Sequence, residues 1–278
     1  MEIQVSCTLR YVVPKPTAFV FLIEAAKADA QVITQEVLTL PVGAIFDTYC
    51  EPVTFNRKFR TVLGPGPVEI VYSATADVNA TAFDPTHVYE FDFLNLPLDV
   101  IEYLAPSRYC PSDTFTDFAH AQFGGLPRGH TRVTAICDWI FNNITYQSGS
   151  TGPATSAAEV FQAQRGVCRD FAHLGISLCR ASGIPARYAS VYADRLNPQD
   201  FHAVFQAYLN GPHGAEWFSF DATRMSSVDS LVRIAAGRDA ADVSFAWPQG
   251  EVQSEAPVVN AFAPNRTNSE RAPHAISA

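Results

Sequence analysis

The chain has 278 residues, of which 47% are hydrophobic and 17% are charged, and its formal net charge is −9. This length suggests two domains or one large domain, and the hydrophobic content is enough for a sizeable core, which excludes disorder of the whole chain. The acidic balance argues against a general nucleic-acid binder, because such a protein presents a basic surface.

Residues 1–105 are predicted to form a β-rich N-terminal domain. Its segments are rich in Val, Ile, Thr, Phe and Tyr, and several alternate between polar and apolar residues, as half-buried strands do. Turn formers separate them, including the Gly-Pro-Gly-Pro run at 64–67. Short strands at this spacing favour an antiparallel β-sandwich. The predicted strands are 3–13, 18–24, 31–40, 44–50, 57–63 and 68–78.

Residues 106–250 have a mixed pattern of helices and strands. Apolar residues from Val133 to Ile144 recur every three or four positions, the spacing of a helix face. Ser156 and Glu159 have the spacing of a capping box, which predicts the start of a helix. The predicted helices are 112–124, 130–146, 156–164 and 168–183. The predicted strands are 186–193, 202–209 and 216–221.

The two ends of the chain carry weaker signals. Residues 251–278 have almost no periodicity, and we expect an extended segment there, with disorder in the last ~15 residues. The longest wholly apolar run near the start is 18–23, far shorter than the ~20 residues of a membrane span. The opening MEIQVS has no basic or apolar region of a signal peptide. We therefore expect a cytoplasmic protein with no membrane partner.

The six cysteines are too few for a disulfide scaffold, and no two have the CxxC spacing of a zinc ribbon. In a reducing compartment most of them would be buried, inert thiols. Cys168 differs, because it follows Gly166 and opens a predicted helix. Unpaired backbone donors and the dipole at a helix N-terminus stabilise a thiolate, which is the nucleophilic form. A single cysteine at a helix start is more often structural than catalytic. Whether Cys168 is a nucleophile therefore depends on whether a base and an orienting residue lie near it.

A nucleophilic thiol needs a base within hydrogen-bond reach. His173 is five residues after Cys168, and five helical steps rotate it about 140° away. It is expected to be a packed or hydrogen-bonded helix residue instead. His202 and Asp221 form a better pair. If their hairpin folds about residues 211 and 212, they lie opposite one another, and the carboxylate can orient the imidazole.

These residues lie in segments that resemble the transglutaminase-like superfamily of cysteine enzymes. The resemblance covers residues 100–245 well and the N-terminal domain more loosely. Its motifs are YLAPSRY (103–109), GVCRDFAHL (166–174), GIPARY (183–188), HAVF (202–205), WFSFDATR (217–224) and GRDAADV (237–243). One departure is Val204, which stands where the family often has a tryptophan after the His-Ala pair.

The resemblance implies an α+β fold with a papain-like core, in which the cysteine helix packs on an antiparallel sheet that carries the other two residues. It implies Cys168 as nucleophile, His202 as general base and acid, and Asp221 as the residue that orients His202. The N–H group of Cys168 and the Tyr146 side chain are candidates for the oxyanion hole. Further candidates for the second oxyanion donor are Gln147, Asn142 and Asn143.

The implied reaction is acyl transfer from a peptide or isopeptide amide through a thioester. Water as acceptor gives a peptidase or amidase, and an amine gives a transglutaminase. We favour hydrolysis slightly, because no amine site is evident. No cofactor or metal is expected, and the only expected partner is a peptide or protein substrate, with self-association left open. The alternative is a non-catalytic binding or scaffold protein that has kept the fold.

Overall fold

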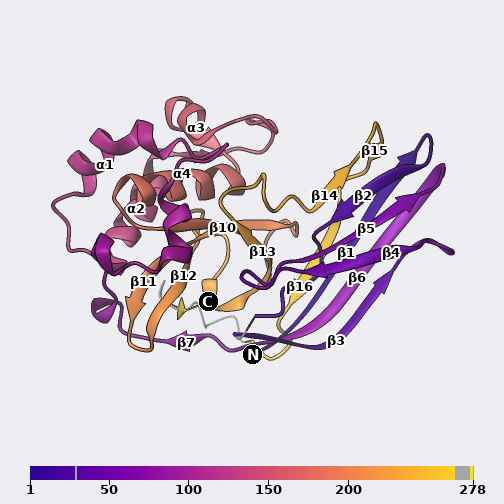
Figure 1. Cartoon of the computed structure of the whole chain (residues 1–278), viewed down its shortest axis with the longest axis horizontal. Coiled ribbons are helices and arrows are strands. Elements are labelled where there is room, and N and C mark those ends of the chain that lie inside the picture. The colour runs from indigo at the N-terminus through magenta and orange to yellow at the C-terminus, as the bar shows by residue number, and fades with distance from the viewer. Residues whose placement is uncertain (29, 267–275, 278) are drawn as a thin grey trace.

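The computed structural model describes residues 1–28, 30–266 and 276–277. A β-rich part and a part of helices packed on a sheet lie side by side along the long axis of the molecule (Figure 1). The disorder expected for the last ~15 residues falls mostly on positions outside the described residues.

The β-rich part consists of two antiparallel sheets. In the first, the strand order is β15-β1-β6-β3, and β16 also pairs with β1; in the second, it is β14-β2-β5-β4. Exposed and buried residues alternate along β1 and β6, as the polar–apolar pattern predicts. The strands are β1 (Glu2–Val13), β2 (Thr17–Phe21), β3 (Gln31–Thr39), β4 (Phe46–Cys50), β5 (Arg57–Leu63), β6 (Gly66–Val78), β14 (Ala246–Pro248), β15 (Gln253–Ser254) and β16 (Val258–Phe262).

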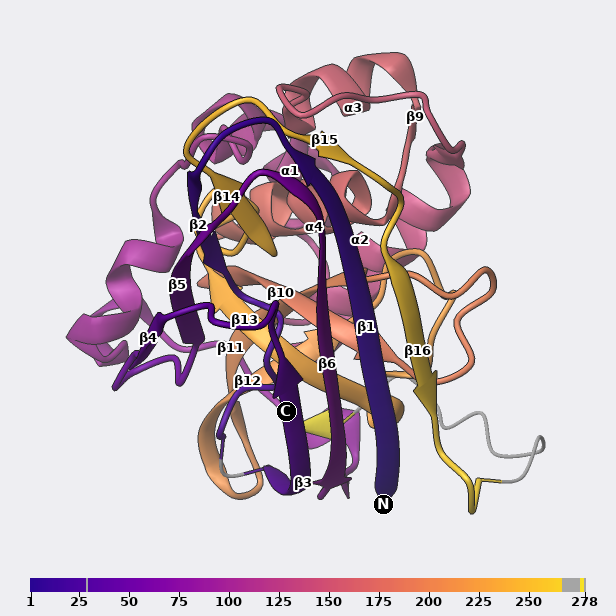
Figure 2. The ribbon, with the colours of Figure 1, turned by 90° about the vertical axis from the view of Figure 1, so that its right-hand side faces the viewer.

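The last three of these strands return from the far end of the chain. In Figure 2 β16 runs beside β1, and the two strands pair antiparallel with Val5 opposite Ala261. Residue Phe21 of β2 pairs with Ala246 of β14. The segment expected to be merely extended over 251–278 thus contains β15 and β16, which join the first N-terminal sheet, and β14 of the second sheet lies just before it. The domain division at residues 105 and 250 itself stays a prediction.

The second part contains the helices and a sheet of order β13-β10-β11-β12-β17-β7. The helices are α1 (Thr116–Phe123), α2 (His130–Asn143), α3 (Ala157–Ala163) and α4 (Cys168–Ala181). The strands are β7 (Thr81–Ala82), β10 (Ala186–Ala193), β11 (His202–Gly211), β12 (Gly214–Phe220), β13 (Leu231–Gly237) and β17 (Ile276–Ser277), and a separate parallel pair is β8 (Thr145–Tyr146) with β9 (Arg165–Gly166). Short 3₁₀ turns are η1 (Pro85–His87), η2 (Phe93–Asn95), η3 (Leu98–Leu104), η4 (Ser112–Phe115) and η5 (Val228–Ser230).

Two predicted helices differ from the structure. The helix expected over 112–124 is divided into η4 and α1. The helix expected over 130–146 ends at Asn143, because Ile144 adopts extended backbone angles. The β-branched pair of Ile144 and Thr145 favours an extended chain, and Tyr146 therefore lies on β8 rather than on a helix.

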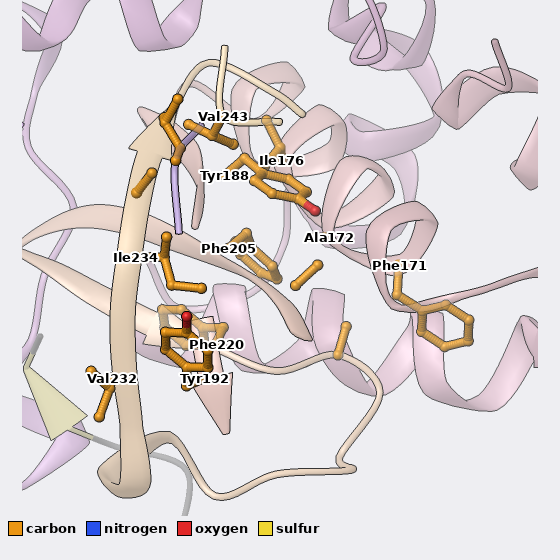
Figure 3. Close-up of a cluster of buried hydrophobic side chains, with 14 of the residues drawn as sticks. Phe171, Ala172, Ile176, Tyr188, Tyr192, Phe205, Phe220, Val232, Ile234 and Val243 are labelled. Carbon is orange, nitrogen blue, oxygen red and sulfur yellow. The ribbon is translucent and has the colours of Figure 1, made fainter. Parts of the chain in front are cut away.

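Helix α4 packs directly on the middle of the sheet. Figure 3 shows Phe205 and Phe220 of the sheet facing Ala172 and Ile176 of the helix. The approach is closest at Gly175, where an added Cβ would lie 2.5 Å from Cε1 of Phe205. This glycine therefore fixes the distance between α4 and β11.

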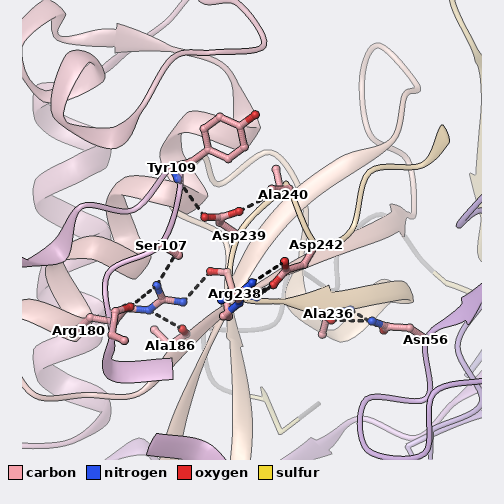
Figure 4. Close-up of polar contacts among 12 residues, drawn as sticks. Asn56, Ser107, Tyr109, Arg180, Ala186, Ala236, Arg238, Asp239, Ala240 and Asp242 are labelled. Atoms are coloured by element: carbon pink, nitrogen blue, oxygen red, sulfur yellow. Dashed lines mark hydrogen bonds and ion pairs between the residues drawn. The ribbon is translucent and has the colours of Figure 1, made fainter. Parts of the chain in front are cut away.

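A buried arginine ties the C-terminal end of α4 to its surroundings (Figure 4). Arg180 donates from Nε to the carbonyl oxygen of Ala186 at 3.0 Å and from Nη2 to that of Arg238 at 2.6 Å. Its Nη1 donates to the Ala105 carbonyl at 2.9 Å and to Ser107 Oγ at 3.0 Å. The side chain of Arg180 thus contacts two outlying segments of the family resemblance, 103–109 and 237–243.

The β-rich part contacts the outer edge of β13 through side-chain amides. Asn56 donates to the carbonyl of Ala236 at 2.7 Å and accepts from its N–H at 2.8 Å (Figure 4). Gln31 forms the same two-way arrangement with the backbone of Arg233, at 2.9 and 2.7 Å. These amides satisfy backbone groups that an edge strand would otherwise leave unpaired.

We predict that Gly175→Ala destabilises the fold by ~1–3 kcal/mol, although alanine has the higher helix propensity, because the new methyl group overlaps Phe205. Gly125→Ala is the matched control, since nothing lies within 4 Å of its Cβ position. Denaturant unfolding of both variants measures the difference. Equal stability of the two variants would contradict the tight contact.

Candidate active site

Cys168 is the first residue of α4, as predicted, and its side chain is half-buried. Asp170 holds the turn that leads into the helix, because its Oδ2 accepts from the N–H of Val167 at 2.9 Å and from Thr151 Oγ1 at 2.5 Å. A Cβ at Gly166 would lie 2.7 Å from the Cβ of Asp170. A side chain at position 166 would overlap Asp170, so a glycine is required two residues before Cys168.

His202 and Asp221 form a buried pair, with imidazole Nε2 2.9 Å from carboxylate Oδ2. The predicted register is wrong by two residues: Phe205 lies opposite Phe220, and the hairpin turns about residues 212 and 213. Side chains alternate between the two faces of a strand, so a register shift of two residues leaves His202 and Asp221 on the same face of the hairpin. His202 begins β11 and Asp221 directly follows β12, and the two side chains meet diagonally at this end of the sheet.

Asp221 is fixed by hydrogen bonds from its own loop. Its Oδ1 accepts from the N–H and the hydroxyl of Thr223 at 2.9 and 2.6 Å, and its Oδ2 accepts from the N–H of Ser226 at 3.0 Å. Sequence reasoning did not single out Thr223, although an Asp-x-Thr sequence is a known local turn signal. These donors and His202 outweigh the effect of burial, and the pKa of Asp221 is lowered.

The imidazole is arranged to carry a positive charge. Burial alone would lower the pKa of His202, but the Asp221 carboxylate outweighs it, and the pKa of His202 rises from 6.5 to about 10. A hydrogen bond with the Cys168 side chain contributes in the same direction. Because Nε2 faces Asp221, Nδ1 is the nitrogen that faces the thiol.

Among the side chains considered for the oxyanion hole, Tyr146 interacts with Cys168. Its hydroxyl hydrogen-bonds with both the backbone and the side chain of Cys168, and burial together with the thiol raises the pKa of Tyr146 to about 12. It is therefore protonated at neutral pH and is able to donate. Asn143 instead donates to the carbonyl of Trp139 at 2.8 Å.

His173 does not reach the cysteine, as the helical rotation predicts. Its ring stacks on Tyr109 with centroids 5.1 Å apart, and its Nε2 accepts from the N–H of Ala240 at 3.1 Å. Complete burial, followed by the nearby arginines 169 and 180, lowers the pKa of His173 well below its usual value. This neutral histidine supports the wall of the site.

Cys168 and His202 line the same cleft of about 680 Å³. Its walls come from the loop 149–153 before α3, from β10, and from the loop 240–247 after β13. Two charged side chains in the cleft were not singled out from the sequence, Arg169 and Asp200. Arg169 directly follows Cys168 and Asp200 is two residues before His202, and nearness in the chain to a proposed catalytic residue is the signal that would have found them.

Neither a metal centre nor a membrane-crossing helix is found in the parts of the chain that the structure describes. No group of three or more His, Cys, Asp or Glu residues there is arranged to hold a metal ion. The helices of these parts lack the combination of length and apolar character that a bilayer span requires. The expectation of a metal-free, cofactor-free protein stays a prediction.

This geometry defines a class: a transglutaminase-like core in which a cysteine helix packs on an antiparallel sheet. The family model of the transglutaminase-like superfamily matches residues 116–222. A crystal structure of a candidate cysteine protease from Cytophaga hutchinsonii is 36% identical with a TM-score of 0.91, covering 100% of this chain and 97% of that one. The chain belongs to the transglutaminase-like superfamily.

Two curated relatives match over shorter stretches. An uncharacterized protein of Mycobacterium leprae is 30% identical over 155 residues, 51% of this chain and 53% of that protein. An uncharacterized protein of Mycobacterium tuberculosis is 38% identical over 115 residues, 37% of each chain. The matched stretch thus spans about half or less of these relatives.

The histidine–aspartate pair predicts a pH-dependent stability. The raised pKa of His202 stabilises the fold fully below pH 6.5, and this contribution is lost as pH rises through about 10. The lowered pKa of Asp221 contributes above pH 3.8 and is lost at lower pH. The free energy of unfolding should therefore fall above pH 6.5, on the order of a few kcal/mol by pH 10.

Denaturant unfolding across this range measures the effect. In Asp221→Asn the carboxylate that raises the His202 pKa is gone, and the fall should largely disappear. His213→Gln, in the exposed hairpin turn, is the control that should behave as the wild type. A pH profile of Asp221→Asn parallel to that of the wild type would rule out this coupling.

Proposed function

We propose that the protein is a cysteine-dependent acyl-transfer enzyme that acts on peptide or isopeptide amides. The observation that carries the proposal is the imidazole of His202, whose Nε2 is 2.9 Å from Asp221 and whose other nitrogen faces the thiol at the start of α4. A cation and a helix N-terminus both favour negative charge on sulfur. The thiol is thus paired with a base that is itself oriented by a carboxylate.

In the proposed reaction the Cys168 thiolate attacks the carbonyl carbon of the amide. The oxygen of the tetrahedral intermediate takes the negative charge, and its proposed hydrogen-bond donors are the N–H of Cys168 and the hydroxyl of Tyr146, whose interaction with Cys168 supports this role. His202 then gives its proton to the amide nitrogen, the carbon–nitrogen bond breaks, and an amine leaves. Asp221 keeps the ring in place and stabilises its positive charge.

The remaining thioester is resolved by an acceptor whose proton His202 removes. Water yields a carboxylic acid and the free thiol, whereas an amine yields a new amide. We favour water, because no residue of the described cleft is arranged as an evident amine site.

A cytoplasmic location belongs to this proposal. All six cysteines are free thiols, and four of them are buried. Free thiols are typical of a reducing compartment, and the proposed chemistry requires one at Cys168. A peptide or protein is the proposed substrate, and a nucleic-acid partner is not proposed, in view of the net charge of −9.

Alkylation by iodoacetamide tests the activation of the thiol. At about pH 6 we expect Cys168 to react at least about tenfold faster than Cys50, the exposed cysteine of the same chain. Site-resolved mass spectrometry measures both rates in one sample. The four buried cysteines provide an unreactive background, because burial raises their pKa values.

His202→Gln should slow the labelling of Cys168 towards that of Cys50, while the Cys50 rate stays unchanged. His213→Gln is the matched histidine control. Equal rates at Cys168 and Cys50 in the wild type, or no effect of His202→Gln, would favour a non-catalytic binding protein that has kept the fold.

Turnover of amides tests the reaction itself. Incubation with a peptide library and mass spectrometry should reveal cleaved products, and Cys168→Ala should abolish them without loss of the fold. An added primary amine distinguishes the acceptors, because transfer adds the mass of the amine and hydrolysis adds that of water. Cleavage retained in Cys168→Ala would remove the cysteine from the mechanism.

A further inference from the structure

The cleft of Cys168 contains aromatic side chains that the proposed reaction does not use. Phe245 and Trp247 lie on the segment that follows β13, and Phe201 directly precedes His202 in the chain. These three residues, called the aromatic wall below, line the same cleft as Cys168 and His202. The rings of Phe201 and Phe245 stack with centroids 5.0 Å apart. An apolar surface therefore starts next to the proposed base and extends along the cleft.

The aromatic wall is in part open to solvent. Phe245 is 38% exposed, and Phe201 and Trp247 are each half-buried. A single exposed ring is ordinary on a protein surface, but stacked rings inside a cleft of about 680 Å³ are typical of a ligand site. Apolar area thus remains there for a bound group to cover.

The charged residues of the cleft are already engaged with the backbone. Arg169 donates from Nη2 to the carbonyl of Gly152 at 2.7 Å, and Oδ1 of Asp200 accepts from the N–H of Phe201 at 2.7 Å. The aromatic rings have no comparable fixed partner on the side of the cleft. The interaction that the cleft offers most clearly to a substrate is therefore apolar contact.

The β-rich part holds the aromatic wall in place. The carbonyl oxygen of Phe245 accepts from the N–H of Leu22 at 3.0 Å. Trp247 belongs to β14, where it pairs with Val20 of β2, and β14 lies with the β-rich part in Figure 1. Two of the three aromatic residues are thus positioned by backbone hydrogen bonds to the N-terminal sheet, so the wall is formed before any substrate binds.

We propose that the aromatic wall binds an aromatic or large aliphatic side chain of the peptide substrate, next to the amide that Cys168 attacks. This inference rests on the proposed function, because the thiol and His202 define where that amide lies. It makes Phe201, Phe245 and Trp247 specificity-determining residues and gives the β-rich part a role in the choice of substrate. Because apolar contact is non-directional, the wall selects for size and apolar character.

Two alkylating reagents with the same reacting group test this inference. The thiolate displaces iodide from both iodoacetamide and N-benzyliodoacetamide, but only the second reagent carries an aromatic ring. Site-resolved mass spectrometry gives the rates at Cys168 and at the exposed Cys50 in one sample. The apolar preference of each thiol is its rate with N-benzyliodoacetamide divided by its rate with iodoacetamide. We expect this preference to be at least about tenfold greater at Cys168, because the ring covers apolar area of the wall.

Variants of the wall locate the effect. Phe245→Ala should bring the apolar preference of Cys168 towards that of Cys50, whereas Phe245→Leu should keep most of it, because leucine retains apolar area. Phe93→Ala is the matched control, since Phe93 is 64% exposed and does not line the cleft. If Phe245→Ala fails to fold, as judged by loss of a cooperative unfolding transition, Trp247→Ala takes its place.

The ratio separates this inference from the proposed function, because the intrinsic reactivity of each thiol cancels. Slow labelling of Cys168 by iodoacetamide would contradict the proposed cysteine chemistry, and a preserved apolar preference would still support the wall as a binding surface. Equal apolar preferences at Cys168 and Cys50 would overturn the wall as a binding site, even when Cys168 reacts fast. An unchanged preference in both Phe245→Ala and Trp247→Ala would overturn it as well.

Discussion

The close packing of α4 on β11 is the constraint on which the proposed site depends. Gly175 permits this approach, since any side chain there would overlap Phe205. The helix begins seven residues earlier at Cys168, so its distance from the sheet also sets where the thiol meets His202. The position of the sulfur is therefore influenced by a close contact in the hydrophobic core, almost two helical turns away from the reacting atoms.

Buried polar groups then hold the surroundings of this helix in place. Arg180 is bound to three carbonyl oxygens and a hydroxyl from three chain segments, which fixes the loop after β13 relative to α4. Asp239 in that loop accepts from the N–H of Tyr109 at 2.9 Å, and Tyr109 stacks on His173. These groups depend on one another, because a movement of the loop after β13 would break several of their hydrogen bonds at once. The network therefore favours a single shape of the cleft wall.

The sequence predicts those parts of the molecule that depend on local chemistry. A cysteine after Gly166 at a helix start, the rotation of His173 and the alternation along β1 all follow from neighbouring residues. The hairpin register does not, because a turn at 212–213 and one at 211–212 are equally compatible with the segment NGPHGA. Strands β13 and β16 were missed for another reason: their partners, β10 and β1, are distant in sequence.

A cavity on the face of the sheet that points away from α4 illustrates the same limit. Arg187 belongs to the GIPARY motif, and its pattern fits a strand residue equally well whether it is paired, stacked or free to bind a ligand. Its surroundings also include Gln31, Val53 and Phe55 of the β-rich part, which are distant in sequence and line the same cavity. One sheet thereby separates two environments: a cleft that contains the pair of His202 and Asp221, and a cavity that is lined by Arg187 and Arg233. Because a charge buried in a protein is costly unless it is compensated, the carboxylate of Asp221 is what allows the buried ring of His202 to carry a positive charge.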